Sequence, residues 1–580
     1  MNADELKLWV KAGRTLEGLE LVDADLRHAD LRAAKLPAAR LTHTRLQSSQ
    51  LTGAVLTTAE LTGCTLGDAE LSGVDLTGAR LLSCSLRGAR LVGAKLAGAS
   101  LPDTDLSGAD LSNANLAGAW LSNCRLDGAV LRGADLTKAR LDEASLKGAD
   151  LRGAILDGVS FVKADMTGAA FEGAMSNATL NEASLRDVNL SALAIDQCRL
   201  LKADLRGATL PRSLTRSLCD EVLFDVARAG QSPTSLAGSD LDGMDLSGAD
   251  LHGANLSATS LRGAKLSRAN LRGTNLEKAV LEGCDLTGAD LTDANLRSAV
   301  LANAKLDGVD LSHRDLEMAI LVGASLERAD LTGAKLTRAA LQNANLTGAN
   351  LSRAVFMGTL MDGAKLGGAN IDKTVFRGVS FGAVELGGLS LAGHSLTYCS
   401  FKDAKLDGAD FTDCDLSCAD FTGASLCGAD FSRSNVAQAN FMRAEMKTAK
   451  LRSVTGKGAF FGEANLQQVD LTRAKLRYAT FSKADVSEAL FASSDVREAP
   501  MTALIAKDTK FLDANLRYSD LSHSELTRAD FSGADLFMTN LHNCRTDRAK
   551  LGEGAASAKG TDMDRLQAET YLPPPLKERL

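Results

Sequence analysis

Aromatic residues are scarce in this chain of 580 residues, at 4% of the total, with two Trp and four Tyr. Several conventional globular cores of that combined size would need more large side chains, so a set of ordinary globular domains is not expected. Leu, Ala, Gly, Asp and Asn carry the sequence instead. This composition points to an interior built from small and aliphatic side chains.

The chain also lacks strong charge, long apolar runs and paired cysteines. Its net charge of −8 is small for its length and predicts neither a basic nucleic-acid-binding body nor a strongly acidic one. No run of about 18 uncharged apolar residues is present, and residues 1–14 lack the features of a secretory signal. The eleven Cys are odd in number and show no paired spacing. These absences predict a cytoplasmic protein without a membrane span and with reduced thiols.

What the sequence does have is an apolar residue at every fifth position for most of its length. One run goes from Leu16 to Leu210, with one spacing shortened to four at Met175, and a second run goes from Leu236 to Leu551. A small residue, usually Ala, stands two positions before each apolar centre. Asp or Asn often precedes the centre, and Gly is common two positions after it. The complete motif A-(D/N)-L-x-G is seen at 249–253.

A period of five fits neither an α-helix, at 3.6 residues per turn, nor a flat strand, at 2.0. It fits a square coil with one pentapeptide on each side and twenty residues per turn. The apolar centre and the small residue point inward, and Gly after the centre supplies the positive φ of a type II corner. Successive coils are then expected to stack by backbone hydrogen bonds at roughly 4.8 Å.

Stacked coils predict that special residues recur every twenty positions, and they do. Asn255, Asn275 and Asn295 form an outward column, and Tyr398, Tyr478 and Tyr518 share one line. Two structural columns of Phe, ten residues out of phase, are expected on opposite sides of the interior. The first column consists of Phe381, Phe401, Phe421, Phe441, Phe461 and Phe481. The second column consists of Phe411, Phe431, Phe491, Phe511 and Phe531.

These repeats resemble the pentapeptide-repeat protein superfamily, over about nine-tenths of the chain. The resemblance implies an all-β fold, a right-handed quadrilateral β-helix. It is specific for fold and not for function, because the superfamily is functionally diverse. Some members protect DNA gyrase from inhibitors and resemble duplex DNA in shape and negative charge. Large members with a helical cap are often linked to contractile, type VI-like bacterial secretion machinery as adaptors or cargo partners.

The repeat pattern predicts two solenoid modules, each preceded by a short capping helix. Asn2 to Ala12 reads as a helix with Asn2 as N-cap, Glu5 completing a capping box and Gly13 as stop. Pro211 to Ser235 breaks the period, and Leu214, Leu218, Val222 and Val226 have helical spacing, with Gly230 as C-cap. The expected domains are a cap at 1–15, a solenoid at 16–210, a helical insert at 211–235, a solenoid at 236–552, and a C-terminal cap and tail at 553–580.

Signatures of catalysis or cofactor binding were sought and not found: the chain has no GxxxxGK[ST], HExxH or CxxC. Eight of the eleven Cys occupy the inward small position, where a buried thiol replaces Ala. Cys414 is expected to face in and Cys418 out, so the pair is not expected to share a metal. His394 falls at an inward position and reads as a tolerated polar substitution. No catalytic residue, cofactor or metal site is predicted, and the chain is not expected to be an enzyme.

One outward column is apolar and is the predicted interaction stripe: Val280, Val300, Ile320, Ala340 and Leu360, with Val322 beside it. It has two interpretations, either β-propensity at an outward strand position or a contact strip for a protein partner or a second copy. Register defects at Gly456, Pro500 and Ala506 are expected to be neutral.

Outward columns of charged residues bear on whether the chain could mimic duplex DNA. Short acidic columns occur at Asp290, Asp310 and Asp330 and at Asp410 and Asp430, and a basic patch occurs at Arg262, Lys265, Arg268 and Arg272. The sequence therefore favours a protein-interaction scaffold of the bacterial cytoplasm, with nucleic acid not expected as a partner. The alternative is a DNA-mimicking protein that binds gyrase.

Overall fold

The computed structural model describes residues 3–219, 222–224 and 235–571. The chain divides into two units, Met1–Ala304 and Lys305–Leu580, and both are built from the same coil. The repeat-by-repeat alternation of buried and outward residues follows the period of five in both units. The predicted all-β solenoid is therefore confirmed.

The pentapeptide 250–254 shows how one side of the coil forms. The N–H of Leu251 donates to the carbonyl of Asn270 in the next coil at 2.9 Å, and the N–H of Asn270 donates to the carbonyl of Ala249 at 2.8 Å. The corner closes through a bond from the N–H of Ala254 to the carbonyl of Leu251 at 3.0 Å. Gly253 stands in this corner at φ +65°, and the residue before it does not have a positive φ, as a type II turn requires.

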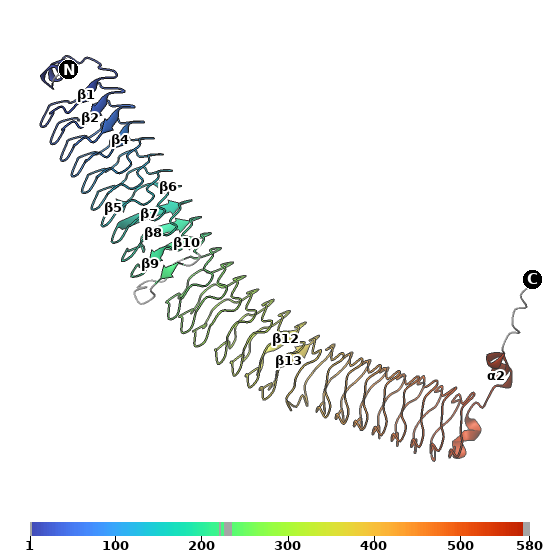
Figure 1. The fold of residues 1–580 in the computed structure, drawn as a ribbon. Helices are drawn as coiled ribbons and strands as arrows, with labels where there is room; N and C mark the ends of the chain where they lie inside the picture. Colours follow the sequence, from blue (N-terminus) through green and yellow to red (C-terminus); the bar gives the residue numbers. More distant parts are fainter. Residues whose placement is uncertain (1–2, 220–221, 225–234, 572–580) are drawn as a thin grey trace, which may run out of the picture. The chain divides into compact units, whose positions relative to one another are not determined.

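The regular strands of the first unit pair in parallel between neighbouring coils (Figure 1), in three separate sheets. β1 (Glu20–Val22), β2 (Arg40–Thr42), β3 (Glu60–Thr62) and β4 (Arg80–Leu82) form one sheet with a register of twenty residues. A second sheet has the order β10-β8-β7-β5, with β6 paired to β7, and a third pairs β11 with β9. The bounds of these strands are β5 Asp150–Arg152, β6 Leu156–Asp157, β7 Ala170–Ser176, β8 Leu193–Asp196, β9 Asp204–Leu205, β10 Ser213–Thr215 and β11 Leu223–Phe224.

The shortened spacing before Met175 has a direct structural result. The strand β7 runs through the place where a corner would otherwise stand, and Phe171 and Met175 are both buried at its two ends. The register to the preceding coil drops from twenty to nineteen residues, as in the pair Ser160↔Thr179. A four-residue spacing thus replaces one turn by continuous strand and leaves the stack intact.

The second unit contains β12 (Val355–Met357) paired in parallel with β13 (Val375–Arg377). Its other coils stack through single parallel bridges at a register of twenty, except the last, Asn540↔Lys559, which has a register of nineteen. Its C-terminal end carries η2 (Glu553–Ser557) and α2 (Met563–Thr570). Asp562 caps α2, because its side chain accepts from the backbone N–H groups of Asp564 and Arg565. The segment 553–580, expected to hold the C-terminal cap and tail, thus includes η2 and α2.

The structure places α1 (Ala3–Lys11) where the sequence predicts the first helix. Its end is closed by Gly13 at φ +66°, with the N–H of Gly13 bonded to Val10 at 2.9 Å and the N–H of Arg14 bonded to Trp9 at 3.2 Å. This pair of bonds is the Schellman arrangement. Leu6 of α1 is fully buried, so the helix docks through an apolar contact. The predicted N-cap, Asn2, lies outside the described residues.

The predicted helical insert at 211–235 is wrong over the part that the structure describes. Residues 213–215 are the strand β10, which pairs with β8, and Leu214 donates its N–H to Ser235 at 2.8 Å. The helical spacing misled because Leu218 points outward, 49% exposed, whereas Ser217 and Cys219 fill the inward positions of one more pentapeptide. The backbone ladder to neighbouring coils outcompetes a lone helical pattern. Val226 and Gly230 lie outside the described residues.

The interior of the second unit contains the two Phe columns. Phe381, Phe401, Phe421, Phe441, Phe461 and Phe481 stack with ring centroids 4.8–5.0 Å apart. In the second column the stacked neighbours are 4.7–4.9 Å apart, over Phe411 and Phe431 and over Phe491, Phe511 and Phe531. Rings of the two columns meet edge to face, for example Phe421 and Phe431 at 5.6 Å and 89°. The interior is thus filled across its width.

The register defects leave the stack of coils intact. Gly456 is flanked by Val436 and Leu476, whose methyl groups would lie 2.7 and 2.6 Å from an added Cβ, so neighbouring side chains already occupy its space. Pro500 bridges to Asp520, and Ala506 is fully buried and bonded to Glu525. A further defect that the periodicity did not reveal is Leu389, which stands at the inward position that most often holds Ala.

Candidate functional sites on the outer faces

Most polar residues at inward positions share one hydrogen-bonding rule, which explains why they need no ligand. The side chain donates to the carbonyl of the residue 23 positions earlier, as Thr274 does to Leu251 at 2.9 Å and Cys284 to Leu261 at 2.7 Å. His394 follows the same rule, with its Nε2 2.9 Å from the carbonyl oxygen of Ile371. These groups are therefore satisfied by the coil itself.

The thiols behave as buried small groups. Desolvation raises the pKa of Cys124 to about 12 and that of Cys399 to about 12. The thiolate, which is the form that binds metals and attacks electrophiles, is thus disfavoured at neutral pH. Cys414 is buried, whereas Cys418 is partly and Cys427 fully exposed. The structure therefore places Cys414 and Cys418 on opposite sides of the wall, as the sequence predicts.

In the first unit, the predicted stripe consists of Val280 and Val300. These two residues form a parallel bridge, and each side chain is partly exposed at an outward position. Ser260 bridges to Val280 from the other side and ends the apolar stretch within this unit.

In the second unit, the stripe consists of Ile320, Ala340 and Leu360, which are linked by successive parallel bridges and end at Ser380. Ile320 is 39% exposed and Leu360 is 44% exposed. Val322 is half-buried. The sequence reasoning missed two further exposed apolar side chains at neighbouring positions of the chain, Met318 at 50% and Met357 at 39% exposure.

Residues of the predicted acidic columns accept backbone hydrogen bonds, as Asp310 does from Ser312 at 2.8 Å, and Asp430 is also paired with a cation. Asp430 accepts from the N–H of Ser432 at 2.9 Å and pairs with Lys450 at 3.4 Å in the next coil. In the first unit, Glu20, Arg40, Glu60 and Arg80 alternate in sign with N–O separations of 3.5–4.0 Å. The hydrogen bond from Arg152, together with Arg132, holds the pKa of Asp150 well below its usual range.

Two members of the predicted basic patch, Arg262 and Lys265, are paired with carboxylates. Arg262 lies 3.8 Å from a carboxylate oxygen of Asp242 and 3.6 Å from one of Glu282, and Lys265 lies 3.4 Å from Asp245. Outward Asn residues make their own ladder, in which Asn295 donates to Asn275 at 3.1 Å and Asn275 to Asn255 at 3.3 Å. The faces therefore carry mixed charge rather than a field of one sign.

The Tyr line lies on an exposed corner of the second unit, and a cationic side chain covers each ring. Arg377 lies 5.7 Å from the ring centroid of Tyr398, Arg477 lies 4.7 Å from that of Tyr478, and Arg517 lies 5.9 Å from that of Tyr518. The Tyr side chains remain 40–59% exposed. These cation–π contacts stabilise the corner.

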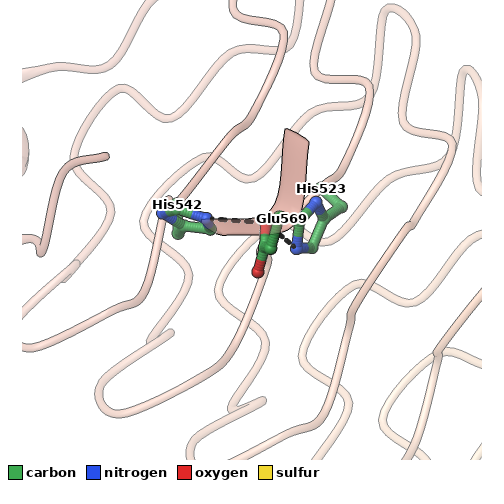
Figure 2. Close-up of side chains that lie close together, drawn as sticks. All are labelled: His523, His542 and Glu569. Carbon is green, nitrogen blue, oxygen red and sulfur yellow. Dashed lines mark hydrogen bonds and ion pairs between the residues drawn. The ribbon is translucent and has the colours of Figure 1, made fainter. Parts of the chain in front are cut away.

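Sequence reasoning missed a cluster at the C-terminal end, where His523, His542 and Glu569 converge (Figure 2). The Oε2 atom of Glu569 lies 3.1 Å from Nε2 of His542 and 3.4 Å from Nε2 of His523. The Nε atom of Arg565 donates to the other carboxylate oxygen at 2.7 Å. The hydrogen bonds from His542 and Arg565 hold the pKa of Glu569 below its ordinary value. No five-residue pattern reports this cluster, since Glu569 belongs to α2.

Two His and one Glu are a common ligand set for zinc, so the proton positions decide what the cluster can do. The backbone N–H of Asp562 donates to Nδ1 of His542 at 3.1 Å. Nδ1 must then carry the lone pair, which leaves the proton of the neutral ring on Nε2, facing Glu569. A metal ligand at Nε2 needs the opposite tautomer. The arrangement fits a carboxylate held by hydrogen-bond donors better than a metal site.

Of the part of the chain that the structure covers, no helix has the length and apolar character needed to cross a lipid bilayer.

A sequence model of the family described as pentapeptide repeats matches residues 20–174, 234–312, 313–378, 395–455, 457–491 and 509–545. This chain belongs to the pentapeptide-repeat family. A search of curated proteins finds no match.

Several solved structures of pentapeptide repeat proteins are similar to parts of the chain. HetL, involved in heterocyst differentiation regulation in the cyanobacterium Nostoc, is 30% identical over 52% of this chain and 96% of its own, with a TM-score of 0.17. A protein from the Arabidopsis thaliana thylakoid lumen is 36% identical over 18% of this chain and 70% of its own, with a TM-score of 0.13. Full-length QnrB1, a plasmid-mediated fluoroquinolone resistance protein, is 23% identical over 43% of this chain and 96% of its own, with a TM-score of 0.15. TM-scores this low carry no conclusion about function.

Proposed function

We propose that this pentapeptide-repeat protein is a non-catalytic scaffold of the bacterial cytoplasm, whose outward columns bind a protein partner or a second copy. The observation that supports it is the apolar stripe. Ile320 and Leu360 expose apolar side chains in one register, joined through Ala340 by successive bridges, above an interior that is already filled. Apolar side chains that contribute nothing to the core and recur in register are typical of a contact surface.

The stripe also offers a regular geometry to a partner. Outward residues of neighbouring coils are spaced by roughly 4.8 Å, which is the spacing of paired strands. A partner that places apolar side chains at the same repeat would contact Ile320, Ala340 and Leu360 together. An adaptor or cargo role in contractile secretion machinery is a narrower form of this proposal, and the same binding experiment tests it.

The experiment compares the wild type with the double variant Val300→Asp and Ile320→Asp. Sedimentation velocity reports self-association, and quantitative capture from the native host reports other partners. The proposal expects the affinity of self-association or of partner binding to fall at least tenfold, because a buried unpaired carboxylate opposes binding. Ile505→Asp is the matched control, since Ile505 is 38% exposed at an equivalent outward position away from the stripe. If the double variant keeps the wild-type oligomeric state and the wild-type partners, the stripe has no binding role.

The alternative, a DNA mimic that acts on gyrase, has less support from the outer faces. A mimic of duplex DNA needs a continuous run of negative charge, whereas Glu20, Arg40, Glu60 and Arg80 alternate in sign and Asp430 pairs with Lys450. The purified protein, added to gyrase at micromolar concentration, is expected to leave supercoiling and its inhibition by drugs unchanged. Protection or inhibition of gyrase would restore the alternative.

A further inference from the structure

The helix α2 is held to the second unit in an unusual way, because no residue of α2 is buried. The preceding turn, η2, also has no buried residue. A cavity of about 510 Å³ lies beside α2, lined by residues that include Tyr518, Met538 and Arg565. Apolar packing therefore contributes little to the attachment of this helix.

Polar contacts to one buried side chain take its place. His542 is buried, with 2% of its side chain exposed, and it contacts α2 at both ends. Its Nδ1 accepts the backbone N–H of Asp562, the N-cap, at 3.1 Å, and its Nε2 lies 3.1 Å from Glu569 in the last turn. His523 adds a second contact to Glu569, at 3.4 Å (Figure 2).

The proton positions are consistent along the whole cluster. Nδ1 of His523 lies 3.2 Å from the side-chain amide nitrogen of Asn543, which donates to it. Both rings then carry their proton on Nε2, and both protons point to the Glu569 carboxylate. Arg565 completes the set of donors from within α2. A carboxylate with charge-assisted bonds to three donors is held more firmly than by neutral bonds alone.

We propose that His523, His542 and Glu569 form a latch that fastens α2 to the end of the second unit, and that α2 is a releasable cap. The eight residues of α2 are too few for a stable helix on their own, since isolated helices shorter than about 12 residues are marginal in water. Opening the latch therefore unfolds α2 and leaves the coils beneath it folded. Breaking these three polar contacts is therefore enough to release α2, and the interior of the coils does not need to unfold.

Hydrogen–deuterium exchange of the full-length protein tests the latch. Glu569→Ala is expected to raise the exchange rate of the α2 amides at least tenfold, with peptides from residues 441–530 unchanged. His542→Gln is a second variant that removes the Nδ1 acceptor for the backbone N–H of Asp562 and is expected to have a similar effect. Glu553→Ala is the matched control, because Glu553 is an exposed carboxylate in the adjacent η2.

The outcomes distinguish the latch from a cluster that belongs to the core and from a metal site. Unchanged α2 exchange in both Glu569→Ala and His542→Gln would overturn the latch. Exchange that rises equally in 441–530 would also overturn it, since the cluster would then be part of the core. The wild type is measured with equimolar Zn²⁺ and with EDTA, and no change is expected. Slower exchange with Zn²⁺, lost in Glu569→Ala, would show that the cluster is a metal site and would overturn the hydrogen-bonded assignment.

Discussion

The two units fill the same coil with different side chains. In the first unit, the centres from Leu31 to Leu156 are all Leu, whereas from Phe381 onward the second unit places Phe in two opposed columns. The small inward position is Ala in most coils of both units, for example Ala119 and Ala419. The apolar centre therefore accepts side chains of different volume, while the small position stays small.

The aromatic interior gains contacts that the aliphatic one cannot make. Phe421 stacks on Phe401 at 4.8 Å and on Phe441 at 4.9 Å, and meets Phe411 and Phe431 edge to face, each at 5.6 Å. Leu121, at the same phase of the coil in the first unit, is equally buried but has no ring contacts. The difference predicts that the second unit depends more strongly on single inward side chains.

Between the two interiors, removing one ring is the largest expected effect. Phe421→Ala is expected to lower the free energy of unfolding by about 4 kcal/mol, and Leu121→Ala by about 3 kcal/mol, because each leaves a cavity in a close-packed interior. Equilibrium unfolding in urea, followed by circular dichroism, measures both. A larger loss for Leu121→Ala would break the comparison and show that ring stacking adds nothing.

Enlarging the small position comes next. Ala419→Leu and Ala119→Leu are each expected to cost about 2 kcal/mol, since added methylenes in a filled interior force strain. The same urea titration applies, with Ala419→Ser as a control that changes volume little. A neutral effect of Ala419→Leu alone would indicate that the aromatic coils are wider than the aliphatic ones.

Charge on the outer wall has a smaller effect, and its pH dependence has a definite sign. Because Arg152 and Arg132 depress the pKa of Asp150, folding is stabilised above the ordinary Asp range and this contribution is lost as pH falls through the folded-state pKa. Asp150→Asn is expected to lower stability by about 1 kcal/mol at pH 7. Unfolding titrations at pH 7 and pH 3 measure this loss, which is expected to shrink at the lower pH. An equal loss at both pH values would contradict the assignment.

The fold was predictable because nearly every pentapeptide has an apolar and a small residue at the same two positions. A column such as the Phe residues is therefore visible in the sequence. The structure of segment 211–219 was not predictable, because Leu214 and Leu218 are four positions apart, a spacing typical of a helix. Ser217, two positions before the buried Cys219, was the signal for one more pentapeptide. The latch could not be predicted, since it depends on where α2 packs against the coils. The five-residue repeat carries no information about that position.

The central claim is that inward residues stabilise the fold and outward residues bind partners. Two residues adjacent in sequence can therefore have different roles. Ile320 is 39% exposed and Leu321 is fully buried. The most direct test is the free energy of unfolding of Ile320→Asp beside that of Leu321→Asp. The first is expected to lie within about 0.5 kcal/mol of the wild type, and the second to lose more than about 4 kcal/mol. Equal losses in the two variants would contradict the claim.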